Sequence, residues 1–224
     1  MILTEDGLLK ISASRLKAWT SCPQKWAATY IEERPFCPTP AMAFGSALHR
    51  ALEVHHRAQW LGHESGILLD AFTESLDSSD AEVSSKEREK MIGQATGLLS
   101  LYLERFSDEE VHAAELMLKA PVIDPETGED LGELTGIIDL VTADGRLVDL
   151  KTGARAPSSL QAVLQNQVQL DCYRYLVQET SDVYIRTGEI RSLIRTKEPK
   201  VEVTELPSRP FDAFIDLVRR YKRA

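Results

Sequence analysis

G-I-I-D-L-V-T-A-D-G-R-L-V-D-L-K-T-G, residues 136–153, consists of two apolar segments joined by the tripeptide A-D-G. Apolar residues on both sides of such a turn predict a β-hairpin. Each predicted strand contains an aspartate, Asp139 or Asp149, and Lys151 follows two positions after the second. A charge inside a buried strand costs free energy unless it is paired or bound to a metal. The hairpin is therefore predicted to carry a functional site as well as part of a sheet.

Alternation along a strand places Asp149 and Lys151 on one face and Leu150 on the other. The hairpin can also bring Asp139 close to Asp149, where two carboxylates repel each other unless a cation lies between them. Mg²⁺ prefers oxygen ligands and often uses one or two carboxylates, so this pair is a candidate metal site. A lysine beside it could orient a water molecule or stabilise developing negative charge. The alternative, an exposed ion pair between Asp149 and Lys151, explains this triplet alone equally well.

The first half of the sequence predicts helices. Residues 12–31 alternate basic and apolar side chains at helical spacing, with Ser12 or Ser14 as the N-cap. The Cys22-Pro23 step is expected to bend or restart this helix. Three further helices are predicted at residues 41–60, 64–77 and 81–106.

The second half predicts a sheet with additional helices. From about Val111 the pattern becomes that of strands, and residues 157–178 and 209–222 return to helical spacing. D-V-Y-I-R and E-I-R-S-L-I-R predict two short strands around a T-G turn at residues 187–188. This order of elements predicts an α/β or α+β fold with a small mixed β-sheet flanked by helices.

The composition is that of an ordinary globular domain. The 224 residues are 43% hydrophobic and 27% charged, and no apolar run is long enough to span a membrane. The N-terminus M-I-L-T-E-D-G-L-L-K lacks the basic and apolar regions of a secretory signal. Three cysteines without paired spacing, Cys22, Cys37 and Cys172, favour a reducing compartment. We therefore expect one cytoplasmic domain, residues 1–224, without membrane association.

The net charge of −9 is concentrated in one segment. Residues 61–135 carry 18 acidic and 5 basic side chains, whereas residues 1–60 and 136–224 are each slightly basic. Nucleic-acid binding depends on local positive surface, so the total charge neither excludes nor supports DNA as a partner.

Five motifs occur in the order typical of one nuclease family. They are S-R-L-K-A-W-T-S-C-P-Q-K-W (14–26), F-G-S-A-L-H (44–49), G-I-I-D (136–139), D-L-K-T-G (149–153) and Q-L-D-C-Y (169–173). Together they resemble the RecB-type branch of the PD-(D/E)XK nuclease superfamily, whose signature runs G-x-x-D, (D/E)-x-K-T and Q-x-x-x-Y. The resemblance implies an α/β, restriction-endonuclease-like catalytic sheet core in residues 109–224. It also implies a mainly helical part, residues 1–108, that carries the Gly-x-x-x-His motif.

The resemblance implies a role for individual residues of these motifs. His49, Asp139 and Asp149 would bind the metal together with the backbone carbonyl of Leu150, and Lys151 would be the catalytic lysine. Gly45 lies one helical turn before His49 and permits a close approach of another backbone. Without the family, a histidine packed on an amphipathic helix would be the favoured interpretation of His49.

Three further residues are candidates for the site. Glu115 matches an acidic residue on the strand before G-x-x-D; it would bind a second metal or its water, or else is an ordinary strand-edge glutamate. Gln169 and Tyr173 are one helical turn apart and are implied to support the active site and the DNA backbone. Gln165 extends the same stripe, but a solvent-facing polar residue is an equally good explanation there.

The first helix is the candidate DNA-binding element. Its basic side chains could contact a strand by charge, and Trp19 and Trp26 could stack on bases. Packing of an amphipathic helix explains the two tryptophans equally well. The candidate DNA-binding residues of this helix are Arg15, Lys17 and Lys25.

Some relatives hold an iron–sulfur cluster with the cysteine of the C-P motif and three more near the C-terminus. Cys22 matches that first cysteine, but no cysteine follows Cys172, so four thiolate ligands are lacking. We therefore expect Mg²⁺ or Mn²⁺ and no iron–sulfur cluster. No G-x-x-x-x-G-K-(S/T) motif is present either, so no helicase motor is encoded.

The sequence thus predicts a Mg²⁺- or Mn²⁺-dependent deoxyribonuclease, of the exonuclease type, acting in recombination, repair or phage DNA processing. The alternative is a catalytically idle nuclease fold that binds DNA or serves as an accessory subunit. DNA is the expected partner, with a helicase or recombination protein as a further candidate. Cleavage polarity, strand preference, the number of metals and the oligomeric state stay open at this point.

Overall fold

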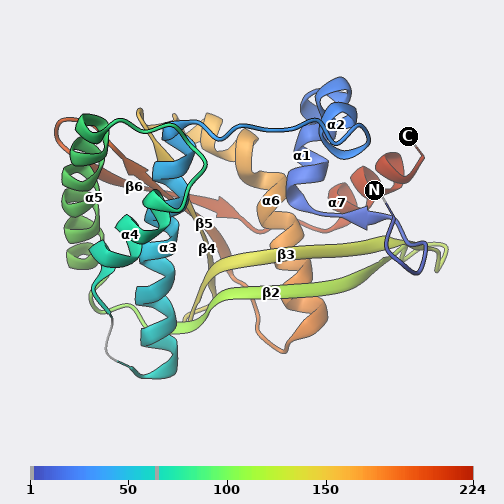
Figure 1. Ribbon diagram of the computed structural model, residues 1–224. Helices are drawn as coiled ribbons and strands as arrows, with labels where there is room; N and C mark the ends of the chain where they lie inside the picture. Colours follow the sequence, from blue (N-terminus) through green and yellow to red (C-terminus); the bar gives the residue numbers. More distant parts are fainter. Residues whose placement is uncertain (1–2, 64–65, 224) are drawn as a thin grey trace.

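The computed structural model describes residues 3–63 and 66–223 (Figure 1). The helices are α1 (Ala13–Ser21), α2 (Pro23–Tyr30), α3 (Pro40–Leu61), α4 (Leu68–Asp77), α5 (Ser85–Arg105), α6 (Ser159–Thr180) and α7 (Asp212–Lys222). The strands are β1 (Lys10–Ile11), β2 (Val111–Ile123), β3 (Asp130–Thr142), β4 (Arg146–Gly153), β5 (Thr187–Ile194) and β6 (Lys200–Pro207).

The strands form one mixed sheet in the order β1-β3-β4-β5-β6, with β2 paired to β3. β2 and β3 are antiparallel along almost their whole length, whereas β4 pairs with β3 only at Leu140 and Val141. β4 and β5 are parallel and are connected through α6. The β2–β3 pair therefore extends as a long arm beyond β4, and the two-residue β1 pairs with β3 there, at Glu133 and Leu134 (Figure 1).

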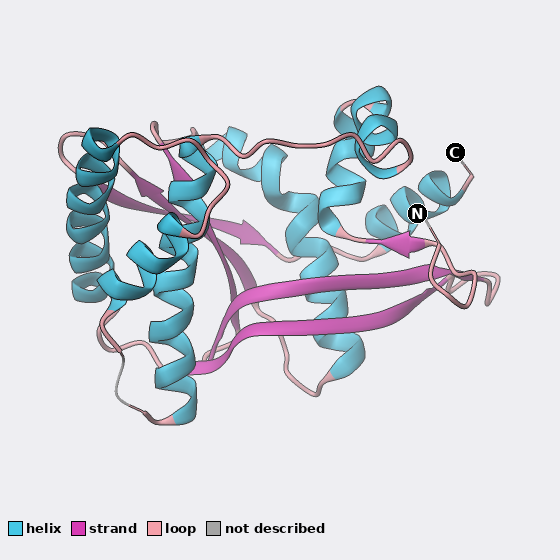
Figure 2. Ribbon diagram, viewed as in Figure 1, coloured by secondary structure: helices cyan, strands magenta, loops and turns pink. Residues whose placement is uncertain are grey.

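Two hydrophobic cores lie on the two faces of the sheet. Alternate residues of β4 divide between them: Leu147 belongs to the core shared with α6 and α7, whereas Val148 and Leu150 belong to the core shared with α3, α4 and α5. Helices thus cover both sides of the strands (Figure 2). This is the mixed α/β, restriction-endonuclease-like architecture predicted from the sequence.

Local sequence signals set the helix ends. Ser12 is the N-cap of α1 and accepts a hydrogen bond from the backbone of Arg15. Cys22-Pro23 separates α1 from α2, as predicted, because proline occupies the first turn of the second helix. Ser158 caps α6 in a capping box with Gln161. The predicted helix at 64–77 begins at positions outside the described residues, and the observed helix there is Leu68–Asp77.

Of the two strands predicted around a T-G turn, the second is confirmed as β5, whereas the first strand and the turn are wrong. Thr187 and Gly188 are the first two residues of β5, and the segment before them is not a strand. β5 pairs instead with β6, which the sequence analysis did not predict, through the turn at residues 195–199. Gly188 can occupy a strand because Leu170 of α6 packs where its side chain would be, with Leu170 Cδ1 2.6 Å from an ideal Cβ. Within the described ranges, no helix combines the length and apolar character of a membrane span.

Candidate active site

Three acidic residues lie in one row across three strands. Ala114 pairs with Leu140 and Leu116 with Ile138, so the β2–β3 register places Glu115 opposite Asp139. The β3–β4 register, in which Leu140 pairs with Val148, likewise places Asp149 on the other side of Asp139. The hairpin thus brings the two predicted aspartates together and adds Glu115 to the row.

Asp149 is fully buried and is held from two directions. Its Oδ1 accepts a hydrogen bond of 2.7 Å from the side-chain amide of Gln169. Its Oδ2 lies 2.6 Å from Nζ of Lys151. This oxygen has the ion pair but no hydrogen bond within the described part of the chain. The predicted Asp149–Lys151 pair therefore exists, but its carboxylate is buried, unlike that of a surface ion pair.

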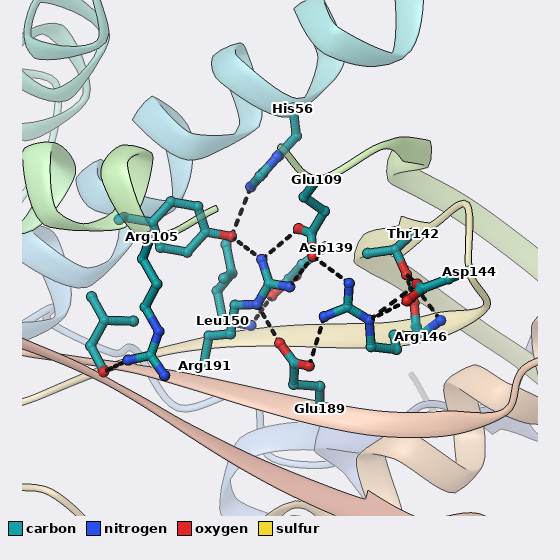
Figure 3. Close-up of polar contacts among 12 residues, drawn as sticks. His56, Arg105, Glu109, Asp139, Thr142, Asp144, Arg146, Leu150, Glu189 and Arg191 are labelled. Carbon is teal, nitrogen blue, oxygen red and sulfur yellow. Dashed lines mark hydrogen bonds and ion pairs between the residues drawn. The ribbon is translucent and has the colours of Figure 1, made fainter. Parts of the chain in front are cut away.

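Asp139 lies beside this pair with its side chain only 12% exposed, and its pKa is raised. Burial and the neighbouring charge of Asp149 both raise the pKa of its carboxyl group. The backbone N–H of Leu150 opposes them by donating to Asp139 Oδ2 at 2.7 Å, a contact visible in Figure 3. Two carboxylates with a single lysine leave an excess of negative charge, which favours binding of a cation or a proton.

His49 enters the site from α3 and is largely neutral. Its Nδ1 lies 3.8 Å from Asp139 Oδ2, while burial and the charge of Lys151 lower the pKa of the imidazole. A neutral imidazole retains a lone pair that can bind a metal. α3 comes this close because Gly45 has no side chain: an added Cβ would lie 2.7 Å from Oγ1 of Thr152 on β4. The G-x-x-x-H spacing therefore reflects a helix packed directly on the strand that carries Asp149.

Glu115 has an unusual backbone and an unusual pKa. Its φ of 48° is left-handed, a conformation that L-residues adopt at a cost and that is frequent at functional sites. Burial raises the pKa of its carboxyl group to about 7, assisted by Glu53 and opposed by Arg57 and Arg50. An ordinary strand-edge glutamate explains neither feature.

α6 places the predicted residues Gln169 and Tyr173 beside Asp149. Gln169 donates to the hydroxyl oxygen of Tyr173 at 3.0 Å as well as to Asp149. The helix lies close to β3 because Gly136 leaves room for Tyr173 and Leu176, whose carbon atoms lie about 3 Å from an ideal Cβ at that position. Gln165, by contrast, is exposed.

The candidate DNA-binding residues separate into two groups. Lys17 Nζ lies 3.4 Å from Gln169 Oε1, next to the acids, and both Lys17 and Lys25 line a groove that starts at Gln169. Arg15 instead packs its guanidinium 4.4 Å from the ring centroid of Tyr30 and does not line the groove. The first-helix tryptophans pack on Tyr221 at ring-centroid distances of 5.6 Å, in agreement with the packing alternative for Trp19 and Trp26.

The donor set fits a divalent cation. The buried Oδ2 of Asp149, the carboxylate of Asp139 and the neutral ring of His49 are oxygen and nitrogen ligands, and the Leu150 backbone is in contact with the imidazole. In the described residues, no group of three or more His, Cys, Asp or Glu side chains is arranged so that it could hold a metal ion without further ligands. Mg²⁺ commonly relies on one or two carboxylates and takes its other oxygens from water and phosphate.

A second group of buried charges lies on the other side of β4. This Arg191 cluster consists of Glu109, Arg146, Glu189 and Arg191 (Figure 3). Arg191 is fully buried and donates to both carboxylate oxygens of Glu109, at 2.6 and 2.7 Å, and to Glu189 at 2.5 Å. Because Arg191 pairs with Leu150 in the β4–β5 register, its side chain lies on the face opposite Asp149. Sequence analysis did not single out this cluster, since none of its members belongs to a motif.

Comparison with known proteins agrees with this geometry. The sequence profile of the PD-(D/E)XK nuclease superfamily matches residues 10–223. Nucleases of this superfamily generally use divalent metal ions. A search of curated proteins finds no match.

Solved structures share the fold at low sequence identity. A protein from Eubacterium rectale described as a candidate exonuclease superposes with a TM-score of 0.59 and 12% identity, covering 95% of this chain and 77% of that one. SSO0001 gives a TM-score of 0.40 and 11% identity, over 85% and 76% of the two chains. LHK-Exo in complex with dAMP gives 0.34 and 11%, over 77% and 87%. The first of these confirms the predicted fold class.

Proposed function

The chain belongs to the PD-(D/E)XK nuclease superfamily, and we propose on this basis that it is a Mg²⁺- or Mn²⁺-dependent deoxyribonuclease. The observation that carries the proposal is the row of Glu115, Asp139 and the fully buried Asp149, with Lys151 beside it. The proposed reaction is hydrolysis of DNA phosphodiester bonds from an end, in recombination, repair or phage DNA processing. The Eubacterium rectale protein with the same fold is described as a candidate exonuclease, which supports exonuclease over endonuclease action.

The proposed ligands are His49, Asp139, Asp149 and the Leu150 carbonyl. A divalent ion held there would polarise the phosphodiester and lower the pKa of a bound water. Lys151, 35% exposed at its side chain, can donate to that water or to a phosphate oxygen while Asp149 fixes its ammonium group. Gln169 holds the other oxygen of Asp149, so that carboxylate cannot rotate freely.

Nuclease assays on end-labelled DNA test the proposal. Single and double strands are incubated with Mg²⁺, Mn²⁺ or Ca²⁺, and products are resolved over time. Wild type is expected to shorten the DNA, starting either at the labelled end or at the opposite end. Asp149→Ala is expected to reduce the cleavage rate to that measured without protein. Asp80→Ala, which removes an exposed acid in the loop after α4, serves as the matched control. Equal rates for wild type and Asp149→Ala would contradict the proposal.

The alternative, an idle nuclease fold that binds DNA or a partner, has one observation in its favour. The 2.6 Å contact between Lys151 and Asp149 already neutralises one carboxylate without any metal. Calorimetric titration with Mn²⁺ distinguishes the two functions. The nuclease proposal expects saturable binding that Asp139→Asn abolishes, and a rise in unfolding temperature with Mn²⁺ only in wild type. Absence of both effects would favour the idle fold.

A further inference from the structure

A groove of about 920 Å³ adjoins the candidate active site. α1 and α2 form one wall, β2 and β3 form the other, and Gln169 and Tyr173 of α6 line its inner part. Figure 1 shows α1 and α2 above the β2–β3 pair and α6 crossing it. Because Gln169 also donates to Asp149, the inner part of the groove lies one side chain away from Asp149.

The β2–β3 ladder connects the acids to the groove. Two cross-strand pairs at an interval of two residues, Met117–Ile137 and Lys119–Thr135, continue the register position that Glu115 and Asp139 occupy between the Ala114–Leu140 and Leu116–Ile138 pairs. Residues two apart on a strand share a face and are separated by about 6.6–6.8 Å. The Met117–Ile137 pair is therefore the first neighbour of the acidic pair, and it lines the groove.

This first pair is apolar and accessible. Met117 is 73% exposed and Ile137 is 46% exposed, although both lie in the middle of long strands. Tyr30 lines the opposite wall and offers an aromatic ring. Apolar and aromatic side chains that face a groove are the surfaces on which unpaired bases stack.

The groove is lined by positive charge, whereas the chain as a whole is negatively charged. The described residues that line it include three lysines, Lys17, Lys25 and Lys119, and no acidic side chain, on a chain with 35 acidic residues. Lys119 forms an ion pair of 2.6 Å with Glu133, so Lys17 and Lys25 supply the charge for a ligand. Lys17 is closest to the acids through its contact with Gln169. Positive charge combined with apolar surface matches a polyanion whose bases are unpaired.

We propose that this groove holds a single strand of DNA, with the base next to the scissile phosphodiester resting on Met117 and Ile137. The proposal rests on the proposed nuclease function and specifies its substrate as a single-stranded end. The groove is in the size range of pockets that enclose one small ligand, which suits one or a few nucleotides and not a double helix. Lys17 and Lys25 contact the phosphates of the strand.

Fluorescence anisotropy with a labelled oligothymidine of about 12 nucleotides measures binding separately from cleavage, in EDTA. Met117→Glu places an acid at the proposed base contact, and Ile67→Glu makes the same change at a 70% exposed apolar residue just before α4. Lys25→Glu and Lys86→Glu form a second matched pair, with Lys86 exposed on α5. Met117→Glu and Lys25→Glu are expected to raise Kd about tenfold, and their controls less than twofold.

The outcomes separate this inference from the nuclease proposal. If Met117→Glu and Lys25→Glu bind the single strand like their controls, or if a duplex of equal length binds wild type more tightly, the groove assignment is wrong even when wild type cleaves DNA. If wild type binds the single strand through these residues but cleaves nothing with any metal, the groove stands and the nuclease proposal fails. Circular dichroism of each variant establishes that the fold is retained.

Discussion

The two groups of charged residues on either side of β4 both lie largely inside the protein, yet they differ in the ratio of positive to negative groups. In the Arg191 cluster, two arginines face two glutamates, and each carboxylate is bound by both guanidinium groups. On the other side, Asp139 and Asp149 share a single lysine, and burial together with their mutual repulsion raises the pKa of Asp139. The Arg191 cluster has as many positive as negative groups, whereas the group around Asp139 and Asp149 has an excess of negative charge.

This difference indicates what each cluster does. Buried charges whose hydrogen bonds are satisfied within the protein hold elements in place: the Arg191 cluster connects β4 and β5 with Glu109, just before β2. Buried charges left unbalanced destabilise the fold until a ligand compensates them, which is typical of functional sites. Glu115, with its left-handed backbone and raised pKa, belongs to the second kind.

Replacing Asp149 is expected to have the largest effect on activity and little effect on folding. Asp149→Asn removes the charge that binds the proposed metal, so DNA cleavage falls to background. The unfolding free energy in EDTA changes by about 1 kcal/mol, because asparagine keeps an acceptor for Gln169, the partly exposed Lys151 can turn to water, and repulsion with Asp139 is relieved. Nuclease assays and urea unfolding check the two parts. A loss of several kcal/mol would assign Asp149 to structure.

The opposite result is expected in the Arg191 cluster. Arg191→Met keeps the volume of the side chain but leaves two buried glutamates with Arg146 as their only remaining partner in the cluster. Removing one partner of a buried ion pair costs about 3–5 kcal/mol, so urea unfolding should shift by this amount. The specific activity of the protein that remains folded should equal that of wild type. If Arg191→Met were as stable as wild type but cleaved no DNA, the Arg191 cluster would not have the purely structural role that distinguishes it from the candidate active site.

The contact between Gly45 and Thr152 tests whether α3 is held at the site by close packing. Gly45→Ala introduces a Cβ 2.7 Å from Thr152 Oγ1, an overpacking that costs about 1–3 kcal/mol. Thr152→Ala removes that oxygen, and the double variant should recover most of the loss. Unfolding free energies of the four proteins form a double-mutant cycle. Additive losses would mean that the two residues do not contact each other.

The sequence predicted the parts of the fold that depend on local signals. Ser12, Pro23 and the A-D-G turn each act on neighbouring residues, so the helix starts and the β3–β4 hairpin were predicted correctly. β6 was missed and Gly188 was misread as a turn, because its place in β5 depends on Leu170 of α6, eighteen positions earlier in the chain. Membership of the PD-(D/E)XK superfamily was also predicted correctly from spaced motifs, whereas the RecB-type branch stays a prediction.

The site was predicted only as far as its motifs extend. Asp139, Asp149 and Lys151 lie within the hairpin, and their proximity follows from its register. The Arg191 cluster joins residues from three separate segments, the residues before β2, β4 and β5, so no local pattern contains it. Met117 and Ile137 likewise become neighbours only through the β2–β3 pairing. Whether the residues act in catalysis stays a prediction until activity is measured.

His56 connects α3 to the Arg191 cluster through Tyr102. The Arg191 guanidinium donates to the Tyr102 hydroxyl at 2.7 Å, so this hydroxyl donates in turn to His56 Nε2 at 3.0 Å. The remaining proton of the imidazole then lies on Nδ1, which donates to Gln59 Oε1 at 3.2 Å. Burial above all lowers the pKa of this histidine to about 3. The neutral ring is therefore the form that the folded protein holds.

A mild pH dependence of stability follows from this histidine. Below the ordinary histidine pKa of 6.5, the unfolded chain binds a proton that the folded protein excludes until about pH 3, so stability decreases as the pH falls. The loss is about 1.4 kcal/mol for each pH unit in that window. His56→Gln, which can still accept from Tyr102 but does not titrate, should show a smaller decrease between pH 7 and 5 in urea unfolding. His112→Gln, at an exposed position on β2, should behave like wild type. An unchanged slope in His56→Gln would mean that acid acts elsewhere in the protein, with His49, whose pKa is also lowered by burial, as the next group to examine.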